Sequence, residues 1–341
     1  MSIKQYIIIA ISVLCTAACV DVIDFDTPEA ERIVTIDASI TAGEPVHTIL
    51  LSNSGRFDII EGPADLAIVG GTVYVTDGQG ERFDFDELTE GEYVNTSLIP
   101  VAGASYQLTV EIDGAVYQSN FETMPQAVPV SELSFDYFSR ELNNTAGNLV
   151  QGEFVRVKAS SNIRAGEYLR YRVDGTYQYN ERASPRNLNP QFCYVDETVD
   201  INLNVIANGS DFTQGIINNL EILEYEVDYK FNQNYCFTVI QGSINEAAYT
   251  FWRAAADEFD RTGDIFETPP SQLRGNVFGS GDSENVIGVF QLINESSAQL
   301  LINTSEVGFP RSNCSFRDEF ESCTNCLVLN RSTLTKPSCF E

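Results

Sequence analysis

Apolar and polar residues alternate with a period of two through most of residues 32–123. Residues 34–40 show the clearest alternation, which is the pattern of a half-buried strand. Similar patterns predict further strands at 47–51, 72–76, 82–86, 106–112 and 116–119. Asp113 and Gly114 separate the last two and supply the positive φ angles that a tight hairpin turn needs. About seven short strands without a helical segment predict an immunoglobulin-like β-sandwich over residues 32–125.

The segment from Leu98 to Tyr106 resembles the chain that leads into a tyrosine-corner strand. Two prolines in residues 124–129 then interrupt the strand pattern, because proline cannot donate a ladder hydrogen bond. We therefore place a domain boundary there. Residues 130–310 are expected to form a larger β-rich domain, a sandwich or a barrel-like fold, with strands near 133–138, 150–159, 167–174, 194–206, 221–230, 235–241, 275–278, 286–293 and 298–303.

One segment of this second domain has helical spacing instead. Its apolar side chains recur three or four residues apart, at Ile244, Ala248, Phe251, Trp252, Ala255 and Phe259. Ser243 and Glu246 have the spacing of a capping box, and Gly263 can end the helix. The sequence therefore predicts one amphipathic helix near 244–262. We expect Trp252 to be a buried anchor against a sheet rather than a platform for a ligand.

The N-terminus has the features of a targeting signal. Lys4 precedes an apolar run about half as long as the ~20 residues that a spanning helix needs, so residues 1–18 are predicted to be a signal peptide. Small residues before Cys19 resemble a lipobox, which predicts lipid on Cys19 and a tether over residues 19–31. An ordinary secreted protein cleaved near Ala18 is the alternative. Carboxylates just after Cys19 resemble the surface-export signal of Bacteroidetes-type lipoproteins, although a solvated tether explains them equally well.

Cysteine usage points to the same compartment. Six cysteines follow Cys19, and four of them lie in the tail over residues 311–341: the full set is Cys193, Cys236, Cys314, Cys323, Cys326 and Cys339. An even number in an exported chain predicts three disulfides. A four-cysteine zinc site in the tail is the alternative. We expect Cys193 and Cys236 to pair within the second domain.

The charge excludes some classes of partner. The chain carries 20 basic and 49 acidic residues, a net charge of −29. Such a chain is not expected to bind nucleic acid, because a polyphosphate needs a positive surface. Residues 20–125 hold 20 acidic and three basic residues and are therefore the more acidic part. Basic residues are concentrated instead in a short run of the second domain: Arg156, Lys158, Arg164, Arg170, Arg172, Arg182 and Arg186.

This basic run admits two interpretations. Arg164, Arg170, Arg172 and Arg182 are candidates for docking an acidic partner or lipopolysaccharide phosphates. Charge balance on exposed strand faces is the alternative, and we favour it.

Motifs for catalysis are few. His47 is the only histidine, and at a probable strand start it is expected to be a surface residue. Neither a nucleophile elbow nor a phosphate-binding glycine loop is present. With 49 acidic residues, a carboxylate pair at glycosidase spacing would occur by chance. Asp84, Asp86 and Glu87 can offer oxygens to calcium, although a solvated strand face explains them better. We therefore expect no catalytic residue, no metal site and no cofactor apart from the covalent lipid on Cys19.

Several features together resemble a known family. They are the lipobox-like start, the early strand at 33–40, the Trp-bearing helix, the segment Pro269 to Asn276 and the cysteines of the tail. Together they look like the Bacteroidetes outer-membrane lipoproteins of domain-of-unknown-function family 4249. The ending Cys339-Phe340-Glu341 departs from the aromatic ending expected there. The resemblance implies an accessory lipoprotein of TonB-dependent receptors of the starch-utilisation type, and no catalytic residues follow from it.

The expected function is therefore that of a non-enzymatic subunit of an outer-membrane complex. Its lipid on Cys19 would anchor it to the outer membrane, facing the cell exterior. The expected partner is a β-barrel, in the first place a TonB-dependent receptor in nutrient capture or uptake, with other surface lipoproteins beside it. The alternatives are an accessory subunit of outer-membrane protein assembly or surface-lipoprotein export, and a hydrolase that uses carboxylates only.

Overall fold

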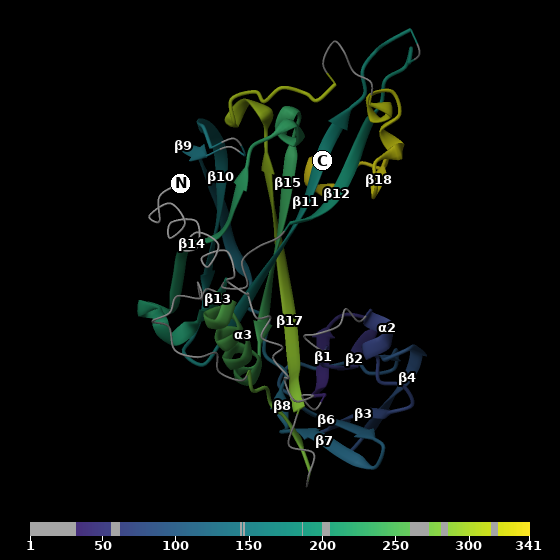
Figure 1. Ribbon diagram of the computed structural model, residues 1–341. Coiled ribbons are helices and arrows are strands. Elements are labelled where there is room, and N and C mark those ends of the chain that lie inside the picture. Colours follow the sequence, from purple (N-terminus) through teal and green to yellow (C-terminus); the bar gives the residue numbers. More distant parts are fainter. Residues whose placement is uncertain are drawn as a thin grey trace, which may run out of the picture.

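A computed structural model describes residues 32–55, 62–143, 145, 147–185, 187–199, 205–259, 273–280, 286–314 and 320–341. The described chain is mainly β, as the sequence predicts, with two sandwiches and one long helix (Figure 1). The first sandwich uses strands β1 (Val34–Ala42), β2 (His47–Asn53), β3 (Thr72–Asp77), β4 (Arg82–Thr89), β5 (Glu92–Asn95), β6 (Ser105–Ile112), β7 (Ala115–Ser119) and β8 (Glu122–Thr123), with the short helix α2 (Pro63–Leu66) between β2 and β3.

Strand β4 joins the two sheets of this first sandwich. It pairs with β5 on one side and with β3 on the other, so it passes from one sheet into the other. The core between the sheets holds Ile36, Ile49, Val73, Tyr93 and Leu108. At one end, the hydroxyl oxygen of buried Tyr106 accepts a hydrogen bond from the backbone N–H of Val101 at 2.8 Å. This bond is the contact that defines a tyrosine corner, which confirms the resemblance seen in the sequence.

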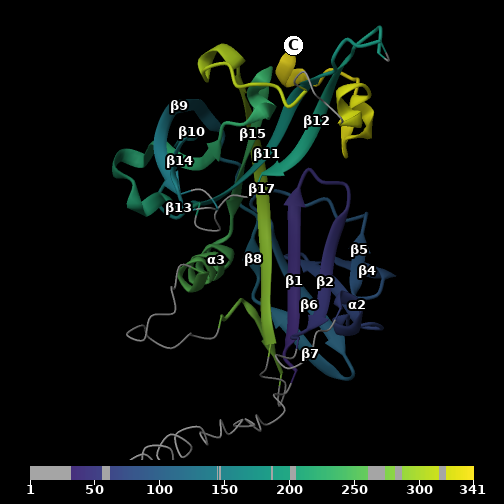
Figure 2. The same cartoon turned by 45° about the horizontal axis from the view of Figure 1, so that its top comes forward.

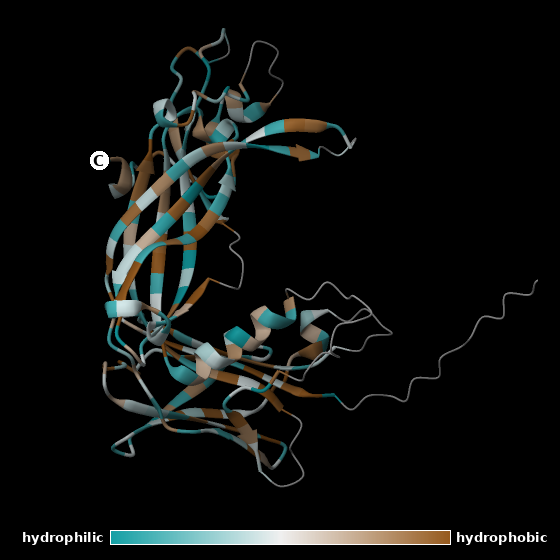
Figure 3. Ribbon diagram, turned by 90° about the vertical axis from the view of Figure 1, so that its left-hand side faces the viewer, coloured by the Kyte–Doolittle hydropathy of each residue, from teal (hydrophilic) through white to brown (hydrophobic). Residues whose placement is uncertain are grey.

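The second sandwich contains β9 (Val130–Asn143), β10 (Leu149–Asn162), β11 (Tyr168–Asn180), β12 (Phe192–Val199), β13 (Ile206–Asn208), β14 (Ile216–Glu226) and β15 (Tyr235–Ile244). A small sheet in the order β14-β10-β9 packs on β15, β11 and β12. Side chains alternate in hydropathy along these strands (Figure 3), and the inward ones form the core. Its largest fully buried members include Phe231, Tyr235 and Phe237.

The remaining elements are three strands and a set of single turns. The strands are β16 (Val277–Gly279), β17 (Val286–Ile302) and β18 (Ser332–Thr333). The turns are 3-10 helices η1 (Gly209–Asp211), η2 (Thr213–Gly215), η3 (Tyr229–Asn232), η4 (Thr304–Glu306), η5 (Glu321–Cys323), η6 (Cys326–Val328) and η7 (Ser338–Phe340).

Strand β17 belongs to both sandwiches (Figure 2). Residues 286–294 pair in parallel with β1, and residues 293–302 pair antiparallel with β15. The described strands therefore form one continuous sheet in the order β16-β7-β6-β3-β4-β5-β2-β1-β17-β15-β11-β12-β18. The chain thus returns to the first sandwich after building the second. Whether the boundaries expected at 125 and 130 separate units that fold independently stays a prediction.

The sequence predicts two strands, 286–293 and 298–303, where the structure has the single strand β17. The polar residues between the two predicted strands have partners at the junction. The amide of Asn294 donates to the carbonyl of Pro125 at 2.9 Å, and the hydroxyl of Ser296 donates to the carbonyl of Val128 at 2.8 Å. Glu295 lies 3.8 Å from Arg172. These residues therefore bind the connector and the neighbouring strand without interrupting β17.

Two asparagines hydrogen-bond to the edge of β17 that faces away from β1. Asn276 accepts from the N–H of Phe290 at 2.7 Å and donates to its carbonyl at 2.9 Å. Asn245 accepts from the N–H of Leu292 at 3.0 Å. Both side-chain amides also donate to the carboxylate of Glu122, each at 2.9 Å. These side chains stand in for a neighbouring strand and satisfy buried backbone groups.

Helix α3 (Glu246–Phe259) lies across the junction on the outer face of the large sheet. Ser243 does not cap it, because this residue is still in β15 and its hydroxyl accepts from the N–H of Val128 at 2.9 Å. The expectation of a fully buried Trp252 is also wrong, since the side chain is only partly buried. Trp252 lies at the margin of the helix contact, where a polar partner is available to its indole N–H.

We predict that Asn276→Ala lowers the free energy of unfolding by about 2–4 kcal/mol. The substitution leaves the N–H and carbonyl of fully buried Phe290 without these partners, at about 1–3 kcal/mol for each unsatisfied group. Urea unfolding of the oxidised protein measures the difference. Asn330→Ala, at an exposed position, is the matched control and should change stability by less than about 0.5 kcal/mol. Equal stabilities of both variants would contradict the proposed role of Asn276.

Candidate functional site

The four arginines that the sequence offers for docking do not form one surface. Arg170 and Arg172 lie on β11, while Arg164 precedes this strand and Arg182 follows it. A strand of 13 residues is about 40 Å long, so Arg164 and Arg182 lie at opposite ends of the second sandwich. Arg186 lies outside the described residues. The run is continuous in sequence but divided in space.

Arg170 and Trp252 form a close cation–aromatic contact on the outer face of the large sheet. The guanidinium carbon of Arg170 lies 3.7 Å from the centre of the indole ring. The indole N–H donates to the side-chain oxygen of Gln291 at 2.9 Å. Burial lowers the pKa of Arg170, and the carboxylate of Asp37 acts against this shift. The arginine therefore covers the exposed side of the only tryptophan and ties α3 to the sheet.

Arg164 lines a surface pocket of about 700 Å³ between the connector 126–129 and the turn at Gln214. Its side chain is 90% exposed and lies 4.0 Å from Glu167, whose carboxylate also accepts from the N–H of Arg164 at 2.7 Å. Gln214 has a positive φ of 65°, which is uncommon for a residue other than glycine. Because Arg164 already has an acidic neighbour, this pocket does not present an unpaired cation.

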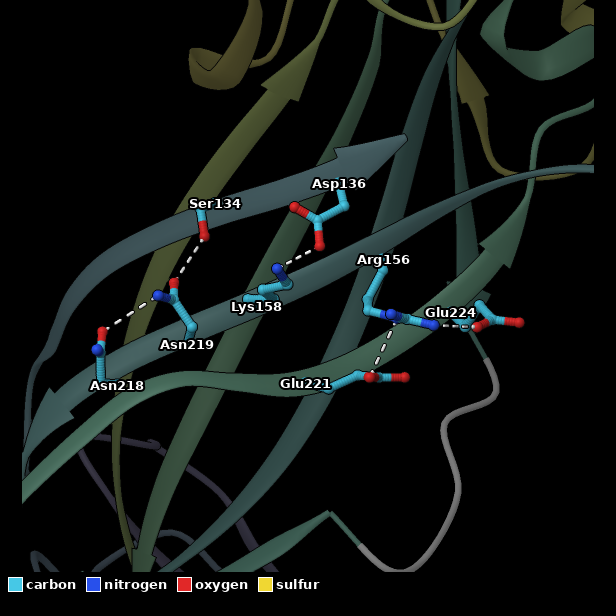
Figure 4. Close-up of polar contacts among 8 residues, drawn as sticks. All are labelled: Ser134, Asp136, Arg156, Lys158, Asn218, Asn219, Glu221 and Glu224. Carbon is cyan, nitrogen blue, oxygen red and sulfur yellow. Dashed lines mark hydrogen bonds and ion pairs between the residues drawn. The ribbon is translucent and has the colours of Figure 1, made fainter. Parts of the chain in front are cut away.

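Arg156 and Lys158 lie on a third surface, the outer face of the small sheet (Figure 4). Arg156 lies between two acidic residues of β14, at 3.1 Å from both Glu221 and Glu224. Lys158 pairs with Asp136 on β9. Arg156 is directly opposite Glu224 in the strand register, whereas its pair with Glu221 and the pair of Lys158 with Asp136 are diagonal. The balance of charge across strands explains this part of the basic run.

The densest cluster of ionisable groups lies elsewhere, at the edge of the second core. The carboxylate of Glu197 on β12 accepts hydrogen bonds from the hydroxyls of Tyr225 at 2.8 Å and Tyr235 at 2.5 Å. Its other oxygen accepts from the ammonium of Lys230 at 2.7 Å, and Lys230 also donates to the hydroxyl of Tyr225 at 2.7 Å. The rings of Tyr177 and Tyr235 stack nearby, with centroids 6.4 Å apart.

The environment of this cluster raises the pKa values of its tyrosines and its lysine, which makes them less suited to proton transfer near neutral pH. Burial, together with Glu197, raises the pKa of Tyr225 to about 12 and raises that of Tyr235 further. Burial opposes the charge of Lys230, but the bonds to Glu197 and Tyr225 outweigh it and raise the lysine's pKa. At neutral pH the tyrosines therefore stay protonated and the lysine stays charged. A general base needs a pKa near the working pH, and these tyrosines and this lysine do not provide one.

The sequence did not single out these four residues. They come from β12, β14, η3 and β15, and nothing in their spacing along the chain relates Glu197 to Lys230. Only the pairing of strands brings them together. A pocket of about 360 Å³ adjoins Glu197 and Tyr177 and is closed on its far side by residues 329–331 of the tail.

His47 is a structural residue of the first sandwich. Its side chain is buried, and its ring N–H donates to the carbonyl of Leu98 at 3.1 Å. Burial lowers the pKa of the imidazole below its usual value. The expectation of a surface histidine at a strand start is therefore wrong in its exposure, although His47 does begin β2.

The six cysteines form three disulfides, as the sequence predicts. The pairs are Cys193–Cys326, Cys236–Cys339 and Cys314–Cys323. The expected pairing of Cys193 with Cys236 is wrong, because their strands β12 and β15 lie on opposite sides of β11. Each of these strand cysteines binds the tail instead. The tail is therefore attached to the second sandwich at two separate points.

The remaining candidates from the sequence are the lipidation site, the acidic residues offered for calcium and any membrane-spanning helix. Cys19 and the tether lie outside the described residues. Asp84 lies on β4 and accepts from the guanidinium of Arg82 at 2.7 Å. In the described ranges, no group of three or more His, Cys, Asp or Glu side chains is arranged to hold a metal ion. Among the helices of that same part, none is both long and apolar enough to cross a bilayer.

We predict that Arg170→Ala exposes Trp252. Because Trp252 is the only tryptophan, its emission should shift to the red and acrylamide should quench it more strongly. Arg172→Ala is the matched control, since Arg172 lies on the same strand face but pairs with Glu295. Steady-state fluorescence of both variants checks this prediction. Identical quenching in the two variants would mean that Arg170 does not cover the ring.

We predict that Tyr225 weakens the fold at alkaline pH. Its raised pKa means that the folded state keeps a proton that the unfolded state has lost, so its stabilising effect is complete below about pH 10 and declines toward pH 12. Between these values the wild type should lose stability up to about 1.4 kcal/mol per pH unit faster than Tyr225→Phe. Urea unfolding at pH 9–12 measures both slopes. Parallel curves would exclude the coupling.

Comparison with known proteins gives one match. A family model described as "Domain of unknown function (DUF4249)" matches residues 20–299. This range includes both sandwiches and all but the last three residues of β17. No curated protein matches the chain. The match confirms the family that the sequence resembles, and it covers well over half of the residues. The chain therefore belongs to the DUF4249 family.

Proposed function

We propose that this protein is a non-enzymatic lipoprotein of the outer membrane that faces the cell exterior. Lipid on Cys19 anchors it there, and it works as a subunit of a membrane complex. Its partner is a β-barrel, a TonB-dependent receptor in nutrient capture or uptake, beside other surface lipoproteins. Membership of the DUF4249 family, which the family model shows, is the starting point of this proposal.

The cluster around Glu197 carries the non-enzymatic part of the proposal. It is the place where a catalytic site would be sought, because several ionisable side chains meet there. Both oxygens of Glu197 accept hydrogen bonds from neighbouring side chains of the chain itself. The pKa shifts of Tyr225 and Lys230 favour the unreactive forms. A cluster that is satisfied internally stabilises a fold and supports a function exerted through surfaces.

The disulfides support the proposed location. Three disulfides join all six cysteines that follow Cys19. Such bonds persist in oxidising compartments outside the cytosol. The signal peptide predicted over residues 1–18 leads to the same compartment. Lipid on Cys19 then explains how a chain whose described helices do not cross a bilayer stays at a membrane.

Purification of the tagged, full-length protein from membranes in a mild detergent tests the proposal. We expect a mature chain that begins at acylated Cys19, detected by intact mass, and a β-barrel that copurifies at a fixed ratio. A receptor barrel supports uptake, whereas a barrel of the assembly or export machinery would replace this role with the alternative one. A protein without lipid, or one that elutes without any barrel, would contradict the proposal.

A further inference from the structure

Large apolar side chains are exposed where the tail meets the connection between β11 and β12. We call this region the stapled end and define it as the described residues 181–185, 187–193 and 320–341. Six large apolar side chains there are between 46% and 81% exposed: Leu188 (81%), Phe320 (64%), Leu327 (51%), Phe192 (47%), Leu334 (47%) and Val328 (46%). A cluster of this kind on a soluble surface is a mark of an interaction site.

Specific contacts make these side chains neighbours. The disulfide Cys193–Cys326 places Phe192 beside Leu327, because each is adjacent in sequence to one of the bonded cysteines. The pairing of Val195 with Ser332 and of Tyr194 with Thr333 brings Leu334 to the level of Cys193. The amide of Asn187 donates to the carbonyl of Thr324 at 3.1 Å, which holds Leu188 against the tail. The segments that carry the exposed side chains therefore lie next to one another.

Disulfides and hydrogen bonds join the two segments of the stapled end. Buried Glu181 accepts hydrogen bonds from the N–H of Cys326 at 2.9 Å, the amide of Asn187 at 2.7 Å and the N–H of Gln191 at 3.0 Å. Burial would raise the pKa of Glu181, but these bonds outweigh it and lower the pKa. The carboxylate therefore stays charged and ties both segments together. Such preorganisation reduces the entropy lost on binding.

The charge of this region differs from that of the rest of the chain. The described residues of the stapled end include three basic and three acidic side chains, a net charge of zero, in a chain of net charge −29. One of the acidic residues is the buried Glu181, so the surface is more basic than this count. Arg331 and Lys336 are exposed at its border. An apolar patch with basic residues around it complements an apolar patch with acidic residues around it.

The position of the patch favours a protein over the bilayer. The residues before Val34 enter the structure at the start of β17, since Val34 pairs with Val286. The stapled end lies at the level of Ile302, the last residue of β17. Ile302 pairs with Tyr235 on β15, Tyr235 pairs with Tyr177 on β11, and Tyr177 pairs with Val195 on β12. Sixteen residues of β17 separate these levels, or about 50 Å. A lipid anchor before residue 34 would leave the stapled end on the far side of the molecule.

We propose that the stapled end docks a partner protein through an apolar patch bordered by carboxylates on that partner. This inference rests on the proposed function, because it names the surface through which the complex forms. Leu188 and Leu327 are the central contacts, and the basic residues at the border orient the approach. The disulfides keep the surface in its binding shape.

The test compares Leu188→Asp and Leu327→Asp with Ile99→Asp in the full-length, tagged protein. Ile99 is a matched control because it is as exposed as Leu188, at 81%, and lies in a loop of the first sandwich. After purification in mild detergent, we expect each stapled-end variant to retain at least about tenfold less partner than wild type. Ile99→Asp should retain the wild-type amount. Thiol titration should find all three disulfides intact in every variant.

The outcomes separate the two proposals. A wild-type protein that purifies without a partner contradicts the proposed function itself. A partner that stays bound to both stapled-end variants overturns the docking surface alone. Flotation of the protein without its lipid anchor with phosphatidylglycerol vesicles covers the remaining case. If this protein floats with the vesicles and each stapled-end substitution abolishes flotation, the patch is a membrane contact and the inference is overturned. If the protein does not float, the result supports a protein partner.

Discussion

The hydrogen-bond ladder of β17 is the interaction on which the arrangement of the molecule depends. One strand satisfies β1 along its first half and β15 along its second half, so neither sandwich has a complete sheet without it. An extended strand of 17 residues cannot bend freely while both halves are paired. The two sandwiches are therefore held by backbone bonds in addition to side-chain packing. Gly275 shows how closely the chain is packed here, since a Cβ at this residue would lie 1.5 Å from the carbonyl oxygen of Gly288.

Polar side chains complete this junction where apolar packing cannot. The change of partner along β17 leaves backbone groups of Phe290 and Leu292 without a strand beside them, and Asn276 and Asn245 satisfy these groups. The connector between the sandwiches is bound in the same way, because the carbonyl of Val128 accepts from Gln241 at 2.6 Å and from Ser296 at 2.8 Å. Buried polar groups impose direction, so these bonds fix register and angle together.

The sequence was sufficient for the local structure and insufficient for contacts between distant segments. Period-two patterns predicted the strands of the first sandwich, and helical spacing predicted α3, because both depend on neighbours a few residues away. Nothing in the sequence indicated that residues 294–297 continue the strand, since the partners of this polar run, Pro125 and Val128, are more than 160 residues away. The disulfide pairs and the cluster around Glu197 were hidden for the same reason. Strand order decides both, and no pattern in one sequence reveals strand order.

Charge and topology act together in the proposed setting. Residues 20–125 carry 20 acidic and three basic residues, and the chain enters the first sandwich from the side that a lipid on Cys19 would attach to the membrane. Screening limits charge effects to about 8–10 Å, so only the part nearest the membrane responds to anionic headgroups. That part is the acidic first sandwich, which such headgroups repel. The lipid tether would keep this end nearest the membrane in spite of that repulsion, and the stiffness of β17 would hold the stapled end at the far side of the molecule, where its apolar surface meets proteins rather than lipid.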